Sequence, residues 1–175
     1  MKVAIVSNGL QTESRSRILA RTAYDDLTKR GVEAIFVDMR SFHLPLCDAE
    51  EQSLNHPNAS RLKEIFQSVD GFILATPVYN FGPNSTLKNL IELTGGAWAN
   101  KVVGFLCAAG GHRSYMSIMA TANSLMLDFR CLIIPKFVYA VKDDFTGEGV
   151  SPEIQQRIEE QNSYLLKLCA ALSPK

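Results

Sequence analysis

Five short apolar runs, each followed by a stretch with helical periodicity, repeat along this chain of 175 residues. The runs are Lys2–Val6, Glu33–Asp38, Gly71–Ala75, Lys101–Cys107 and Leu132–Ala140. Each run is short enough for a buried strand, and each interval leaves room for one crossover helix. Strands that alternate with helices in this way form a parallel sheet, so the alternation predicts an α/β fold.

Right-handed crossovers place the helices on both faces of such a sheet, which gives a three-layer sandwich. Five strands fit the order 2-1-3-4-5, the flavodoxin-like arrangement, in which the ligand crevice lies at the carboxyl ends of strands 1 and 3. The length suits one domain, and no repeat or linker divides residues 1–175. The sequence therefore predicts a single flavodoxin-like domain with a five-stranded parallel sheet.

The charge balance and the cysteine pattern argue against several classes of protein. Lys and Arg number 18, Asp and Glu also number 18, and no basic run marks a nucleic-acid partner. No segment approaches the roughly 18 apolar residues of a membrane helix, and the first apolar run is too short for a signal peptide. The 4 cysteines are too scattered for a metal site or a disulfide framework. We expect a cytoplasmic protein without metal, membrane or nucleic-acid partners, in which Cys107 and Cys169 are buried thiols.

The stretch Gly71–Thr94 combines a strand, a stiff loop and a helix. The strand Gly71–Ala75 is followed by the loop Thr76–Asn84, and helical periodicity resumes at Ser85. Two prolines, a glycine and two aromatic residues make up much of this loop. At the carboxyl end of a strand, such a loop can form a wall against a flat ligand. The alternative is a stiff turn whose aromatic side chains only cover the end of the sheet.

The loop after the first strand supplies hydroxyl groups and the start of a helix. Ser7, Ser14 and Ser16 provide hydroxyls, and Arg15 and Arg17 can add positive charge toward an anion. The unpaired N–H groups at a helix N-terminus favour a phosphate there. The loop matches neither the Walker nor the Rossmann glycine pattern. The alternative is an ordinary serine N-cap with solvated arginines.

A third loop, after the fourth strand, contains Gly110, Gly111, His112 and Arg113. Its glycines let the backbone approach a ligand closely, and Arg113 or the helix start could support negative charge on a ring. The alternative is a flexible turn with a surface histidine. In the 2-1-3-4-5 order, the three loops meet at one crevice. A phosphate site, a planar wall and a close backbone together indicate a site for flavin mononucleotide (FMN).

Two motifs in the third strand–helix unit carry a resemblance to a known family. Thr76-Pro77-Val78-Tyr79-Asn80, followed by Leu87-Lys88-Asn89, resembles the T-P-x-Y-N…L-K-N signature of the NADPH-dependent FMN reductase family. The similarity in element order covers nearly the whole chain. Val78, where glutamate is frequent, and Gly110-Gly111 resemble the branch of that family associated with alkanesulfonate utilisation.

The resemblance implies a flavin-dependent NAD(P)H oxidoreductase with FMN as cofactor. Reduced nicotinamide, as NADPH or NADH, would give hydride to FMN, and electrons would pass to a flavin, a quinone or another small-molecule acceptor without a catalytic protein residue. A homodimer or homotetramer is also implied. The expected contacts to FMN are Ser7, Ser14, Arg15, Ser16, Pro77, Val78, Tyr79, Asn80, Phe81, Gly110, Gly111, His112 and Arg113.

Three positions depart from the family pattern. Gln11 stands where an arginine is expected, Phe81 where glycine is common, and Pro83 one place earlier than the usual proline. The first change falls in the predicted phosphate loop. The other two fall beside the predicted nicotinamide side of the pocket.

Three other functions are open alternatives. A flavodoxin-type electron carrier would not react directly with NAD(P)H, and such carriers are generally acidic for steering to partners. An enzyme for another phosphorylated ligand on the same fold would not take up flavin. A degenerate interaction module would keep the fold and lose the pocket. Flavin uptake and direct oxidation of NAD(P)H distinguish these alternatives from a reductase.

Overall fold

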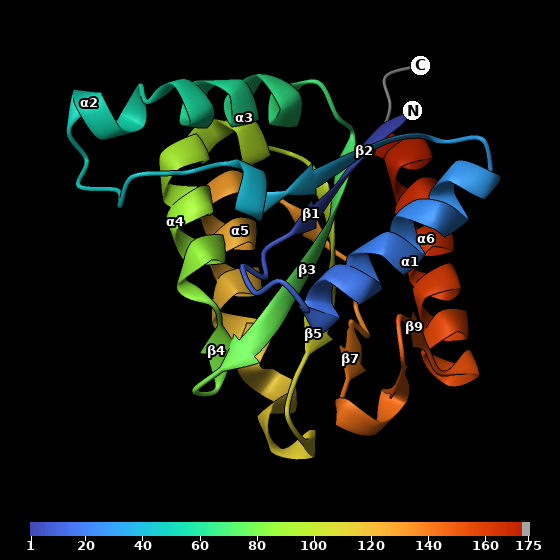
Figure 1. The fold of residues 1–175 in the computed structure, drawn as a ribbon. Helices are drawn as coiled ribbons and strands as arrows, with labels where there is room; N and C mark the ends of the chain where they lie inside the picture. Colours follow the sequence, from blue (N-terminus) through green and yellow to red (C-terminus); the bar gives the residue numbers. More distant parts are fainter. Residues whose placement is uncertain (173–175) are drawn as a thin grey trace.

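The computed structural model describes residues 1–172, which form a central sheet with helices on both faces (Figure 1). Its parallel strands are β1 (Lys2–Ser7), β2 (Glu33–Asp38), β3 (Gly71–Tyr79), β5 (Val102–Ala108), β6 (Leu132–Ile133) and β7 (Val138–Ala140). Their order is β2-β1-β3-β5, followed by β6 and β7, which both pair with β5. Because β6 and β7 pair with successive parts of β5, they are two pieces of one fifth strand. The predicted flavodoxin-like order 2-1-3-4-5 is confirmed.

The continuous fifth strand predicted over Leu132–Ala140 is wrong in its middle. The chain leaves the sheet between Ile133 and Val138. Pro135 has no N–H to donate to a neighbouring strand, and Lys136 adopts a left-handed φ of 57°. The interruption falls at Pro135, as expected from the rarity of proline inside a sheet away from edges and bulges.

Strand β3 is four residues longer than the predicted run Gly71–Ala75, because it continues through Thr76 to Tyr79. The chain then turns back as β4 (Gly82–Pro83), which pairs antiparallel with Val78 and Tyr79. The segment predicted as a loop is therefore a β-hairpin. Pro77 is tolerated because β1 ends opposite Ala75, so the last part of β3 has no parallel neighbour on that flank.

Two groups of helices cover the two faces of the sheet (Figure 1). α1 (Arg15–Lys29) and α6 (Pro152–Leu172) cover one face, and α3 (Pro57–Gln67), α4 (Ser85–Thr94) and α5 (Met119–Phe129) cover the other. Successive side chains of β3 point to opposite faces. Phe72 and Leu74 are buried with α3, α4 and α5, whereas Ile73 and Ala75 are buried with α1 and α6.

Short elements fill the connections: η1 (Met39–Ser41), α2 (Glu51–Leu54), η2 (Gly95–Trp98), η3 (His112–Ile118), η4 (Lys142–Asp144), β8 (Phe145–Thr146) and β9 (Gly149–Val150). Two predictions are corrected by them. The apolar pattern predicts a helix from about Ser114 to Asp128, but this segment starts as the 3-10 helix η3, and α5 begins only at Met119. The sequence predicts a loop that contains Asp143, Asp144, Gly147 and Gly149, but this segment contains a second hairpin, in which β8 pairs with β9.

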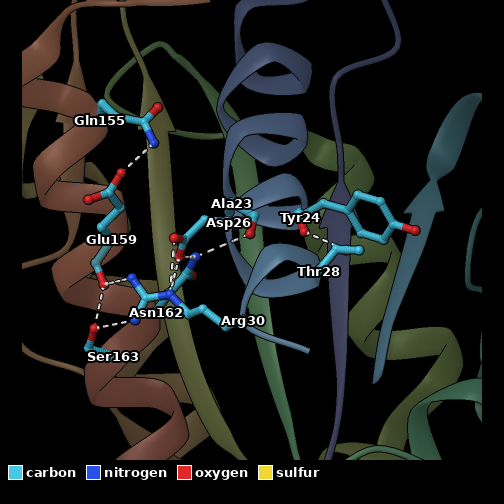
Figure 2. Close-up of polar contacts among 9 residues, drawn as sticks. All are labelled: Ala23, Tyr24, Asp26, Thr28, Arg30, Gln155, Glu159, Asn162 and Ser163. Carbon is cyan, nitrogen blue, oxygen red and sulfur yellow. Dashed lines mark hydrogen bonds and ion pairs between the residues drawn. The ribbon is translucent and has the colours of Figure 1, made fainter. Parts of the chain in front are cut away.

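A polar network joins α1 to α6 (Figure 2). The buried amide of Asn162 donates to the Ala23 carbonyl at 3.1 Å and to the Asp26 carboxylate at 2.8 Å. Arg30 pairs with the same carboxylate at 2.9 Å and donates to the Ser163 hydroxyl at 2.7 Å. These contacts fix α1, whose other end begins at Arg15, against the C-terminal helix.

Three of the cysteine thiols are buried, which confirms the prediction for Cys107 and Cys169. Burial raises the pKa of Cys107 to about 12, and it raises the pKa values of Cys131 and Cys169 to about 11. Within residues 1–172, no helix is long and apolar enough to span a bilayer, and no group of His, Cys, Asp and Glu could hold a metal ion.

Candidate functional site

A cavity of about 1100 Å³ lies at the carboxyl ends of β3 and β5, beside the start of α1. Four segments that are distant in sequence line it. They are the first loop with α1 (residues 11–18 and Arg21), the end of β3 (residues 77–79), the end of β5 (residues 108–110), and Lys142, Phe145, Gly147 and Glu148 from η4 and the β8–β9 hairpin.

The first loop brings two serine hydroxyls together beside the N-terminus of α1. The Oγ atoms of Ser14 and Ser16 are 2.9 Å apart, and both side chains are buried. A Cβ atom on Gly9 would lie 2.0 Å from the Ser14 Oγ and 2.5 Å from the Ser16 Oγ, so glycine is required for this packing. Ser14 is the N-cap residue, yet its side chain makes no capping hydrogen bond within the described chain. The ordinary serine N-cap is therefore not what this side chain forms.

Cationic side chains line this cavity, and Arg17 among them shares a carboxylate with Arg40, which lies outside the lining. Arg17 pairs with Asp38 at 3.0 Å, and Arg40 pairs with the same carboxylate at 2.7 Å. Burial raises the pKa of Asp38, but the hydrogen bonds and charge of Arg40, together with the charge of Arg17, outweigh it and lower that pKa overall. Arg15 and Lys142 supply further positive charge along the lining.

A buried polar cluster holds the first loop against the β3–β4 hairpin. The Asn84 amide donates to the Asn8 carbonyl at 2.6 Å, and the Thr76 hydroxyl donates to the Asn84 side-chain oxygen at 3.1 Å. The Asn8 backbone N–H donates to the Ala75 carbonyl at 2.9 Å. All three side chains are at least nine-tenths buried, so these bonds fix the distance between two walls of the cavity.

The other end of the cavity is formed by the ends of β3 and β5. Pro77, Val78 and Tyr79 line it, and Tyr79 is 48% exposed, so its ring borders open space. A Cβ atom added to Gly110 would meet nothing within 4 Å, so this backbone also faces open space. The Tyr139 hydroxyl donates to the Gly111 carbonyl at 2.6 Å, which fixes the loop after β5. A flat group could therefore lie between the end of β3 and this backbone.

The structure brings together about half of the predicted contacts to FMN. Those that line the cavity are Ser14, Arg15, Ser16, Pro77, Val78, Tyr79 and Gly110. The others are not part of its lining: Ser7, Asn80, Phe81, Gly111, His112 and Arg113. Ser7 is fully buried at the end of β1, whereas the remaining five are exposed in the hairpin turn and around the start of η3.

The contribution of the segment after β7 was missed in the sequence. Lys142, Phe145, Gly147 and Glu148 reach the cavity only through the packing of the β8–β9 hairpin, and they belong to no motif. A signal was nevertheless present. Gly147-Glu148 between strand-like residues is a glycine-first two-residue turn, which is typical of a hairpin.

The residues present fit FMN. Serine hydroxyls, arginines and the N-terminus of a 15-residue helix suit a phosphate group, and the cavity at the ends of β3 and β5 can accept a planar ring. The volume is sufficient for a ligand of that size. A 2-1-3-4-5 parallel sheet with such a cavity at its carboxyl edge defines a flavodoxin-like nucleotide-binding protein.

Comparison with known sequences identifies the family. The model of the NADPH-dependent FMN reductase family matches residues 1–146, and the chain belongs to that family. It is accordingly an NAD(P)H-dependent oxidoreductase that uses FMN.

Individual relatives agree with this assignment. The chain is 27% identical over 132 residues to an NAD(P)H-dependent FAD/FMN reductase of Geobacillus thermodenitrificans, which covers 74% of this chain and 71% of the relative. It is 25% identical over 170 residues to an NADPH azoreductase of a Bacillus species, with 94% and 93% covered. The flavoenzyme FerB of Paracoccus denitrificans, an NAD(P)H:(acceptor) oxidoreductase, has a similar fold, with a TM-score of 0.76 at 17% identity over 95% of this chain and 97% of that one.

Proposed function

We propose that this protein binds FMN in the cavity beside α1 and uses NAD(P)H to reduce a small planar acceptor there. The observation that carries the proposal is the cavity itself. It joins a phosphate-type end, built from Ser14, Ser16 and Arg15, to a ring-type end, built from the ends of β3 and β5. The chemistry supplied by bound FMN is hydride acceptance from reduced nicotinamide and electron transfer onward.

At the phosphate end, the protein's part is to bind and orient. The paired hydroxyls of Ser14 and Ser16 and the first N–H groups of α1 would donate hydrogen bonds to the phosphate oxygens. Arg15 adds a charge that Gln11 lacks, since the resemblance places an arginine at position 11. Charge-assisted bonds of this kind are the strong ones in a site.

At the ring end, Pro77, Val78 and Tyr79 would form one wall and the Gly110 backbone another. Backbone N–H groups after β5 would stabilise negative charge on the pyrimidine edge of the reduced ring. The exposed residues Asn80, Phe81, His112 and Arg113 lie outside the cavity lining, where they would border the approach of a second molecule. Two relatives are named for azo compounds and quinones, which supports a flat acceptor.

The test is binding and turnover with purified protein. FMN binding is followed by fluorescence, and NADPH and NADH oxidation is followed with free FMN, a quinone and an azo dye as acceptors. Replacing Ser14 and Ser16 together with alanine should weaken FMN binding about tenfold or more, because hydrogen bonds to a charged phosphate are lost. Glu64→Gln, on α3 and distant from the cavity, is the matched control. Protein that neither binds FMN nor oxidises NAD(P)H would contradict the proposal.

We also propose a cytoplasmic homodimer or homotetramer, without nucleic-acid or membrane partners. Exposed apolar side chains on η3 and α5 support self-association: Tyr115, Met116, Met119, Met126 and Leu127. Light scattering of the purified protein tests the oligomeric state. Membership of the alkanesulfonate-linked branch stays a prediction.

A further inference from the structure

The β8–β9 hairpin is a built wall of the cavity, although it follows the last strand of the sheet. The family match ends at residue 146, so the turn and β9 lie beyond it. The base of the hairpin is fixed by Asp144, whose carboxylate accepts from the Val141 N–H at 2.7 Å and whose carbonyl accepts from the Ser151 N–H at 2.8 Å. β9 packs against α1. The hairpin is thus held beside the phosphate end.

Phe145 on this hairpin holds Arg15 in place. The guanidinium carbon of Arg15 lies 5.7 Å from the centre of the Phe145 ring, within the range of a cation–π contact. The other two cavity arginines are positioned by different partners: Arg17 by the carboxylate of Asp38, and Arg21 by the ring of Phe36 at 4.1 Å. Arg15 is therefore the cavity arginine whose position depends on the hairpin.

The tip of the hairpin limits what can extend past the phosphate. Gly147 and Glu148 line the same cavity as the residues at the start of α1, and β9, which follows this turn, packs against α1. In the proposed binding mode the phosphate of FMN lies at the start of α1, so a flavin monophosphate would end there. A flavin dinucleotide would have to carry a second phosphate past the Glu148 carboxylate and the turn, and like charges at close range repel each other.

We propose that the β8–β9 hairpin makes the cavity selective for a flavin monophosphate. Phe145 is a positioning residue that holds Arg15 toward the phosphate, and the Gly147–Glu148 turn closes the end where a dinucleotide would continue. The inference rests on the proposed binding of FMN in this cavity, and it goes further by naming the residues of the hairpin that select among flavins.

Flavin-free protein is titrated with FMN, riboflavin and FAD, and each Kd is measured by fluorescence. Wild type should bind FMN at least about tenfold more tightly than riboflavin, which lacks the phosphate, and than FAD. Phe145→Ala should weaken FMN binding about three- to tenfold and leave riboflavin binding unchanged, because only the phosphate contact is lost. Phe145→Tyr keeps the ring and should restore the wild-type ratio.

Two further variants complete the test. Arg15→Ala combined with Phe145→Ala should bind FMN no more weakly than Arg15→Ala alone, because Phe145 acts through Arg15. Glu148→Gln removes the carboxylate charge, so it should bind FAD more tightly relative to FMN than wild type does.

The outcomes separate this inference from the proposed function. If none of the three flavins binds, the proposed function is overturned together with the inference. If FMN binds but Phe145→Ala leaves the FMN-to-riboflavin ratio unchanged, or if wild type binds FAD as tightly as FMN, the inference alone is overturned.

Discussion

The β3–β4 and β8–β9 hairpins stand at the same edge of the sheet and close in the same number of residues, but they differ in how they make the turn (Figure 1). In β8–β9 the turn is Gly147-Glu148, and the left-handed φ of 62° falls on the glycine. In β3–β4 the turn is Asn80-Phe81, and both residues are left-handed, with φ values of 49° and 64°. Only the β8–β9 turn has glycine at the position with a left-handed φ.

The difference shows where the fold can hold strain. A bulky residue in a left-handed conformation costs about 1–2 kcal/mol, and such strain persists where the surroundings fix the backbone. The β3–β4 hairpin is fixed by Asn84, whose buried side chain bonds to Asn8 and Thr76. The contacts described for β8–β9 lie at its base and at the Arg15–Phe145 pair. The β3–β4 hairpin, which has the stronger buried anchoring, is thus the one that carries a strained bulky residue, Phe81.

Removal of the Asn84 hydrogen bonds should have the largest effect on the free energy of unfolding. Asn84→Ala deletes one partner of two buried hydrogen bonds, so the free energy of unfolding should fall by about 2–4 kcal/mol. Chemical denaturation measures it. Asn58→Ala is the control, since Asn58 is only half-buried and its side chain donates to one carbonyl, that of His43. Equal losses in the two variants would show that the buried cluster does not anchor the hairpin.

Gly147→Ala should cost about 1–2 kcal/mol, because alanine disfavours a left-handed φ. No steric clash contributes, since a Cβ atom on Gly147 would meet nothing within 4 Å. Gly149→Ala, in the same hairpin but without a left-handed φ, is the matched control and should have a smaller effect. Both are measured by denaturation. If both variants lose the same stability, backbone conformation is not the cause.

Phe81→Gly should act in the opposite direction. Relief of the left-handed strain outweighs the greater flexibility of glycine in the unfolded chain, so the free energy of unfolding should rise by about 0.5–1 kcal/mol. Phe81→Ala keeps the Cβ atom and should show no such gain. Thermal unfolding of the three proteins distinguishes strain relief from loss of an exposed aromatic ring. A gain of the same size in both variants contradicts the strain explanation.

An effect as small as that of Phe81→Gly concerns Asp38, which lies outside both hairpins and pairs with Arg40 and with Arg17 on the cavity wall. Its pKa is lowered in the folded protein, so its stabilisation is complete above its ordinary value of about 3.9 and is lost as the pH falls through the lower folded value. The difference in stability between wild type and Asp38→Asn should be about 0.5–1 kcal/mol at neutral pH, because the pair is partly exposed. It should shrink below about pH 4. Denaturation across this pH range measures it, and a difference that grows in acid would contradict the assignment.

The sequence was sufficient for the order of the sheet, because each strand is a distinct apolar run with one helix after it. It was insufficient where pairing depends on neighbours that are distant in sequence. The sequence predicts that the strand ends at Ala75, yet β3 continues through Tyr79 because β1 has already stopped beside it. Ser14, Arg15 and Ser16, which are local to one helix start, were predicted as phosphate contacts, and all three line the cavity.

The parts of the site that local patterns do not encode were missed. Phe145 and Glu148 reach the cavity by tertiary packing, and the Asn8–Asn84 pair joins residues that are 76 positions apart. Conversely, His112 and Arg113 follow the glycines in sequence but turn into η3 and leave the cavity lining. A loop motif predicts which segment is near a ligand, whereas the direction of each side chain depends on the turn that follows.

The burial of three thiols gives this protein a convenient chemical reporter. Cys107, Cys131 and Cys169 are buried and have pKa values of about 11 to 12, so in the folded state they are protonated and shielded from alkylating reagents. Cys47 is only half-buried. Alkylation of the native protein should therefore attach one label per chain, whereas the unfolded chain would take up 4. Intact mass after a short pulse of reagent would then count folded and unfolded molecules directly, in cell extracts as well as in purified samples.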